Sequence, residues 1–187
     1  TTNYSEEELR QYIQDTLHIK GSMTTYHSIG TSYHGILTQS LFKDNITPFL
    51  QYQDQFGTNA MMMMALAMNE SATGRSYLAY SRNNLFGHAA FDSAVEENAS
   101  RYDSVSKSIY SHALHYLQNG YLNPSNPTWH GAYFGNKASG MNVSYASDPY
   151  WGEKAAQYYI RMDEALGGKD KDTYVLAYPA HDGEIMV

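Results

Sequence analysis

Apolar and polar residues alternate with a helical period from the first residues of the chain. Ser5 is followed three residues later by Glu8, which is the pattern of a capping box, and Tyr4 and Leu9 can form the flanking hydrophobic staple. Apolar residues then continue at helical spacing as far as Leu17. The pattern predicts a first helix that ends near this residue.

The next two predicted helices are separated by a short turn. Pro48 follows Thr47 as a first helical position follows an N-cap, and Gly57 is a natural end for that helix. Asn59 can cap a helix over 60–70, in which four consecutive Met are followed by Ala, Leu, Ala and Met. This helix is apolar nearly all round, which predicts a central buried element with adaptable methionine packing.

Two further helices are predicted in the second half of the chain. One begins at Asp103 or Ser104 and ends at Gly120, and the other begins at the Asp148-Pro149 pair and ends near Leu166.

The stretches between the helices are predicted as irregular structure. Residues 20–34 indicate a loop, 71–100 indicate loops with a short helix and a small β element near His88–Phe91, and 121–147 indicate a long structured loop. A long loop in a compact domain is usually functional or mobile. Residues 169–172 resemble a linker, and Thr173–Tyr178 is β-prone. The irregular regions 71–100 and 121–147 lie beside a mostly helical core, which indicates an α+β fold in which these two regions could form the walls of a cleft.

Composition narrows the classes of function. The 187 residues carry 12 Lys and Arg against 19 Asp and Glu, a formal charge of −7 with no basic run, which argues against general nucleic-acid binding. The absence of Cys excludes disulfides and Cys-type zinc sites. No apolar run is long enough to span a membrane. Low charge content and 18 Tyr favour a surface for sugars or other neutral polar ligands, although Tyr also fills cores.

Glu70 departs from its surroundings because it ends the most apolar helix of the chain. Partial desolvation there would raise its pKa and keep a proton available near neutral pH, which suits the general acid of a glycosidase. The alternative is an ordinary exposed Glu, although a carboxylate at a helix C-terminus is mildly disfavoured. The turn over 81–88, with two Asn, Phe86 and a Gly, could present amide groups and a ring face to an N-acetyl sugar.

Five short motifs in a fixed order carry a resemblance to a known family. They are Glu70-Ser71, Gly74-Arg75-Ser76, Asn83-Asn84-Leu85-Phe86-Gly87, Arg101-Tyr102-Asp103-Ser104 and Tyr145-Ala146-Ser147-Asp148-Pro149. The set resembles glycoside hydrolase family 73, the glucosaminidase domain of bacterial autolysins, from about Phe49 to Leu166. The resemblance implies a mostly helical, lysozyme-like α+β fold with a small β-lobe and a long cleft. We therefore expect an N-terminal region over 1–48, a catalytic domain over 49–166 and a linker or tail over 167–187.

The resemblance also implies roles for single residues. Glu70 matches the general acid, and Tyr145 matches the active-site Tyr of a motif in which Ser147 stands here for Thr. Asn84 and Phe86 match the turn that lines the sugar site. The alternative for Tyr145 is packing at a helix entry, and Asp148 is assigned to capping.

The second catalytic group stays open. Some members of the family place a Glu on a β-lobe, but the corresponding stretch is short here and offers Asp92, Glu96 and Glu97, with Glu97 slightly preferred over Glu96. The acetamido group of the substrate could replace a carboxylate. The sequence therefore does not separate inversion from retention.

Aromatic and His residues add further candidates. Trp129 and Tyr133 could stack on sugar rings or simply pack a loop, and His88 could line the cleft as a hydrogen-bonding residue. Trp151 is expected in the core. The pairs His112 with His115 and His27 with His34 offer no obvious third ligand, so we expect neither a metal nor a cofactor.

The expected function is cleavage of the β-1,4 bond after N-acetylglucosamine in peptidoglycan, by a monomeric extracellular enzyme associated with the cell wall. Glycan strands are the expected partner, and a separate wall-binding module is expected because an acidic domain would not adhere to an anionic wall. The alternatives are a non-catalytic peptidoglycan-binding domain and a lytic transglycosylase that forms anhydro-muramic ends.

Overall fold

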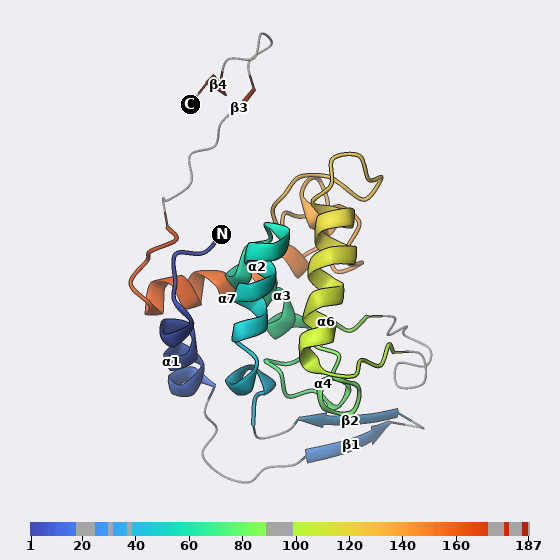
Figure 1. Cartoon of the computed structure of the whole chain (residues 1–187). Coiled ribbons are helices and arrows are strands. Elements are labelled where there is room, and N and C mark those ends of the chain that lie inside the picture. Colours follow the sequence, from blue (N-terminus) through green and yellow to red (C-terminus); the bar gives the residue numbers. More distant parts are fainter. Residues whose placement is uncertain are drawn as a thin grey trace.

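In this computed structural model, the described residues are 1–17, 39–88 and 99–171, together with the strand backbones at 25–29, 32–36, 178–179 and 185–186. The described part is mostly helical (Figure 1). The small β element expected near His88–Phe91 lies almost wholly outside it.

A buried helix, α3 (Ala60–Glu70), forms the centre of the core. The Asn59 side chain caps it by accepting a hydrogen bond from the Met62 N–H at 2.9 Å, and every residue from Ala60 to Met68 except Met62 is buried. The prediction of a central helix is confirmed. Its neighbours are α2 (Thr47–Phe56), which ends at Gly57 in the left-handed region, and α7 (Trp151–Ala165) (Figure 1).

The predicted helix ending at Gly120 has two parts. Ser104 caps α6 (Val105–Ser111) by accepting from the Lys107 N–H, and the chain continues as η2 (His112–Tyr121) with the wider turns of a π-helix. Both parts pack against α2. π-helical turns are rare and frequently occur at functional sites, and η2 begins at a fully buried His112.

Two predictions, one of a loop and one of a helix start, were wrong. The loop expected over 20–34 contains an antiparallel hairpin of β1 (Thr25–Ile29) and β2 (Ser32–Ile36), whose Thr, Tyr and Ile residues are strand formers. Helix α7 begins at Trp151 and not at the Asp148-Pro149 pair, because the Asp148 side chain accepts from the Tyr150 N–H before the helix and does not cap its first turn.

Shorter elements complete the described part. They are the 3-10 helices η1 (Leu41–Asp44) and η3 (Met141–Val143), the helix α4 (Tyr77–Arg82), which contacts β2, and the paired strands β3 (Tyr178–Pro179) and β4 (Ile185–Met186). Among the described residues, no helix has the length and apolar character needed to cross a membrane.

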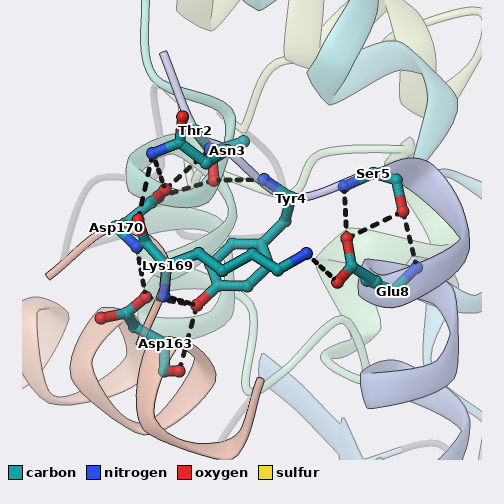
Figure 2. Close-up of polar contacts among 8 residues, drawn as sticks. All are labelled: Thr2, Asn3, Tyr4, Ser5, Glu8, Asp163, Lys169 and Asp170. Atoms are coloured by element: carbon teal, nitrogen blue, oxygen red, sulfur yellow. Dashed lines mark hydrogen bonds and ion pairs between the residues drawn. The ribbon is translucent and has the colours of Figure 1, made fainter. Parts of the chain in front are cut away.

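The N-terminal segment is tied to the end of α7 by a cluster of polar contacts (Figure 2). Helix α1 (Glu6–Thr16) begins with the predicted capping box of Ser5 and Glu8, which is confirmed. Just before it, the Tyr4 hydroxyl donates to Asp163 at 2.5 Å, and the buried Asp170 carboxylate accepts from the Thr2 hydroxyl at 2.6 Å and the Asn3 N–H at 2.7 Å. The contacts join residues more than 150 positions apart, so this segment is an integral part of the fold.

Candidate active site

Glu70 lies at the end of α3 with one carboxylate oxygen firmly held. The Trp151 indole N–H, at the start of α7, donates to Oε1 at 2.5 Å, and the Asn69 amide lies 3.4 Å from the same atom. Burial raises the pKa of Glu70, and the hydrogen bond from Trp151 opposes that rise without cancelling it. The carboxyl group therefore keeps a proton to higher pH than an exposed Glu does.

The other oxygen, Oε2, faces the turn that follows α4. Gly87 has a φ of +62°, and a Cβ built there would lie 3.8 Å from Oε2. Because Oε1 accepts from the indole, the proton of the neutral acid belongs on Oε2. A side chain at position 87 would be strained and would narrow the space beside that oxygen.

Tyr145 stands beside Glu70 and is held by the same tryptophan. Its ring stacks on Trp151 with centroids 4.1 Å apart and planes 21° apart, and Tyr121 lies at 4.9 Å. Burial first, and then the neighbouring Glu70, raise the pKa of Tyr145 well above its ordinary value. The phenol is thus a permanent hydrogen-bond donor next to the carboxyl group.

Trp151 is a site residue that the sequence reasoning placed in the core. It is 4% exposed, as a core residue would be, but its N–H contacts the acid and its ring contacts the phenol. The sequence signal was its position six residues after Tyr145, at the entry of a helix that packs on α3. That spacing alone did not indicate which polar group the indole would meet.

Asn84 is buried inside the turn that follows α4 and holds the backbone of that turn. It is 1% exposed, its amide donates to the carbonyls of His88 and Ser100, and its oxygen accepts from the N–H groups of Phe86 and His88. All four hydrogen bonds of the amide are engaged within the chain. The amide therefore shapes the turn, and its contact with the sugar stays a prediction.

Phe86 and His88 are also buried, at 3% and 4% exposure, in a block of nearly parallel rings. Phe86 stacks on His112 at 3.8 Å and 3°, and His88 stacks on Tyr116 at 4.0 Å and 2°. The two His lie side by side, with His88 Nε2 3.0 Å from His112 Nδ1. Both residues predicted to touch substrate therefore support the turn beside Glu70.

The buried histidines are neutral. Burial lowers the pKa of His88 to about 3 and lowers that of His112 well below its ordinary value. His88 Nδ1 lies 2.6 Å from the Tyr102 hydroxyl, so both of its ring nitrogens have partners inside the protein. His88 consequently has no nitrogen left for a ligand.

Trp129 and Tyr133 are exposed, at 41% and 52%, as ligand-stacking aromatics must be. Tyr133, however, lines a mainly apolar pocket of about 290 Å³ together with Asn59 and Met62. Asn59 lies eleven residues before Glu70, about 16 Å at ~1.5 Å per helical residue. The structure thus brings Tyr133 to the opposite end of α3 from the acid.

Three candidates for the second catalytic group, Asp92, Glu96 and Glu97, lie outside the described residues. In the part of the chain that is described, no three His, Asp or Glu side chains gather into a metal-binding group. The site consists of one desolvated acid, one protonated phenol and the indole that joins them.

Comparison with known proteins decides the family. The profile of the family described as Glucosaminidase, mannosyl-glycoprotein endo-beta-N-acetylglucosaminidase, matches residues 46–164. The chain belongs to this glucosaminidase family. Two proteins from Streptococcus pneumoniae strains, both named as endo-beta-N-acetylglucosaminidases, are 38% identical over 134 residues, or 72% of the chain. The glucosaminidase chain spans only 20% and 18% of the lengths of these relatives.

Solved structures show the same fold. A catalytic mutant of S. aureus autolysin E in complex with the disaccharide NAG-NAM has a TM-score of 0.55 and 20% identity, over 87% of this chain and 68% of that chain. Autolysin E in complex with the muropeptide NAM-L-Ala-D-iGlu gives 0.51 and 22% over the same shares. The mostly helical architecture of the glucosaminidase chain is therefore an autolysin-type fold.

Proposed function

We propose that this glucosaminidase chain hydrolyses the β-1,4 bond between N-acetylglucosamine and N-acetylmuramic acid in peptidoglycan. The observation that carries the proposal is the Glu70 carboxyl group, desolvated and held at Oε1 by Trp151, with the Tyr145 phenol beside it. The family match and the NAG-NAM and muropeptide ligands of autolysin E support the choice of substrate.

Glu70 acts as the general acid. Its Oε2 proton passes to the glycosidic oxygen as the bond from that oxygen to the anomeric carbon breaks, so the leaving sugar departs as a neutral alcohol. Because burial raises the pKa of the carboxyl group, the acid form persists toward neutral pH. The Trp151 N–H then stabilises the carboxylate that remains.

Tyr145 acts on the sugar whose anomeric carbon becomes positively charged as the glycosidic bond breaks. A protonated phenol next to the acid can orient the acetamido group or the attacking water, and its oxygen can stabilise charge at the anomeric carbon. On the opposite face of the ring, either the acetamido oxygen acts as the nucleophile or one of Asp92, Glu96 and Glu97 acts as the base. Water finally adds to the anomeric carbon, and a proton returns to Glu70.

The test is a digest of purified peptidoglycan by the wild type and by Glu70→Gln, followed by borohydride reduction and mass spectrometry. The expected product carries a reduced N-acetylglucosamine end and is absent with the variant. A reduced muramic acid end would indicate a muramidase, and an anhydro-muramic end a transglycosylase. Binding without any product from either protein would indicate a wall-binding domain.

The glycan strand is the partner of this site, and the action is extracellular at the cell wall. A net charge of −7 gives the domain no electrostatic attraction to an anionic wall, so a separate module in a longer chain would supply the attachment. Sedimentation of this chain with purified wall at low and high salt tests the point. Tight binding by this chain alone would remove the need for such a module.

A further inference from the structure

The ammonium group of Lys137 is surrounded by three backbone carbonyl oxygens of the loop that carries Tyr145. Its Nζ donates to the carbonyl of Asn142 at 2.6 Å, of Val143 at 3.1 Å and of Ala146 at 2.7 Å. An ammonium has three N–H groups and here each has an acceptor. Two of the acceptors precede Tyr145 in the chain and one follows it.

The local backbone explains why these carbonyls need such a partner. In η3 the Gly140 carbonyl accepts from the Val143 N–H, and the Met141 carbonyl accepts from the N–H groups of Ser144 and Tyr145. The turn therefore satisfies its first carbonyls internally and leaves the next ones at its end, as helix ends generally do. The Lys137 ammonium binds the carbonyls of Asn142 and Val143 together with that of Ala146, which follows Tyr145.

The backbone of Lys137 is itself anchored. Asn136 closes a tight turn, with its N–H donating to the Ser139 carbonyl at 2.8 Å and its side chain accepting from the Ala138 N–H at 2.8 Å. A Cβ built on Gly152, in the first turn of α7, would collide with the backbone of Gly135. The segment that leads into Lys137 is thus packed, at Gly135, against the helix turn that begins at Trp151.

We infer that Lys137 is a positioning residue of this active site, which holds the backbone on both sides of Tyr145 and so fixes the phenol against Trp151 and Glu70. The inference rests on the proposed function, because it assigns a role in that reaction. Lys137 touches neither the acid nor the phenol and acts through the loop. Such an effect can be large, since a displacement of 1 Å in a site can lower a rate by about 100-fold.

The test is a double-mutant cycle with Lys137→Ala, Tyr145→Phe and the double variant, assayed on soluble glycan fragments. We expect Lys137→Ala to lower kcat by roughly tenfold with little change in KM, and to add almost nothing in the Tyr145→Phe background. Lys107→Ala, on α6, removes an equal charge far along the chain and should keep the wild-type kcat. Thermal unfolding of each variant shows whether it folds.

Independent losses in the two backgrounds, or a wild-type kcat for Lys137→Ala, would overturn the inference while leaving the proposed function intact. A wild type that cleaves no glycan would end both. In addition, methylammonium should partly restore kcat of Lys137→Ala by entering between the three carbonyls, whereas tetramethylammonium, which has no N–H, should not. An equal response to both ions, or a response to neither, argues against a role for the ammonium.

Discussion

Replacing Trp151 with Phe separates the two tasks of this residue. The substitution keeps an aromatic ring to stack on Tyr145 and removes the N–H that donates to Glu70 Oε1 at 2.5 Å. Because that hydrogen bond favours the carboxylate, its loss leaves only the longer Asn69 contact to oppose burial and moves the pKa of Glu70 further upward. A general acid must be protonated to work, so the alkaline limb of the pH profile should move to higher pH.

The size of the movement follows from the difference between two hydrogen bonds. A hydrogen bond to a charged group contributes about 1.5–3 kcal/mol, and one to a neutral group about 0.5–1.5 kcal/mol. The carboxylate therefore loses roughly 1–1.5 kcal/mol more than the acid does. At about 1.36 kcal/mol per unit, the alkaline limb should move upward by about one pH unit.

The assay is kcat/KM against pH from 4 to 9 on soluble glycan fragments. The chain has 2 Trp, and Trp129→Phe makes the same chemical change at an exposed position, where it should leave the limb in place. Glu70→Gln should be inactive throughout. A limb that stays fixed in Trp151→Phe would refute the assignment of the limb to a Glu70 proton controlled by the indole.

Three further predictions concern stability. Burial raises the pKa of Glu70, so ionisation of its carboxyl group destabilises the fold as pH rises. The Tm of Glu70→Gln should therefore exceed that of wild type by an amount that grows from pH 5 to 8. A difference in Tm that stays constant over this range would contradict the prediction. Burial lowers the pKa of His88 to about 3, so as pH falls below about 6.5 the unfolded chain binds a proton at this position that the folded chain does not. The unfolding free energy from urea titrations should therefore fall by about 2 kcal/mol less in His88→Phe than in wild type between pH 7 and 5. Equal falls would show that His88 is not the titrating group. Asp170→Asn leaves too few acceptors for the Thr2, Asn3 and Tyr159 donors. It should lower the unfolding free energy by about 1–3 kcal/mol and leave kcat/KM unchanged at 25 °C. An unchanged Tm would show that the contacts of Figure 2 add no stability.

Local rules predicted much of the helical framework. The capping box of Ser5 and Glu8, the Asn59 cap and the methionine-rich core helix depend on neighbouring residues and on burial pattern, and all three were confirmed. The hairpin at 25–36 was missed because its Ser, Gly and His residues favour loops, while its pairing adds stability that a linear pattern does not show. Helix α7 begins two residues later than predicted, because the Asp148 side chain accepts from the N–H of Tyr150 before the helix.

The site was predicted less evenly than the framework. Glu70 was singled out because a carboxylate at the end of an apolar helix is unusual, and that argument needs no tertiary contact. The roles of Asn84, Phe86 and His88 depend on which side of the turn faces inward, and a sequence of polar and aromatic residues does not specify that side. All three proved to be buried. The expectation that they contact substrate came from their polar and aromatic character and from the family resemblance, and it stays a prediction.

The contacts of Trp151 imply that acid strength and phenol position are coupled in this site. A shift of α7 along α3 would weaken the N–H bond to Glu70 and the stack on Tyr145 together, because a single indole makes both contacts. A variant that loosens α7 should therefore change the pH profile and kcat at the same time. Trp151→Phe should change mainly the profile, and Lys137→Ala should change mainly kcat. The three patterns together distinguish a displaced helix from the loss of either contact alone.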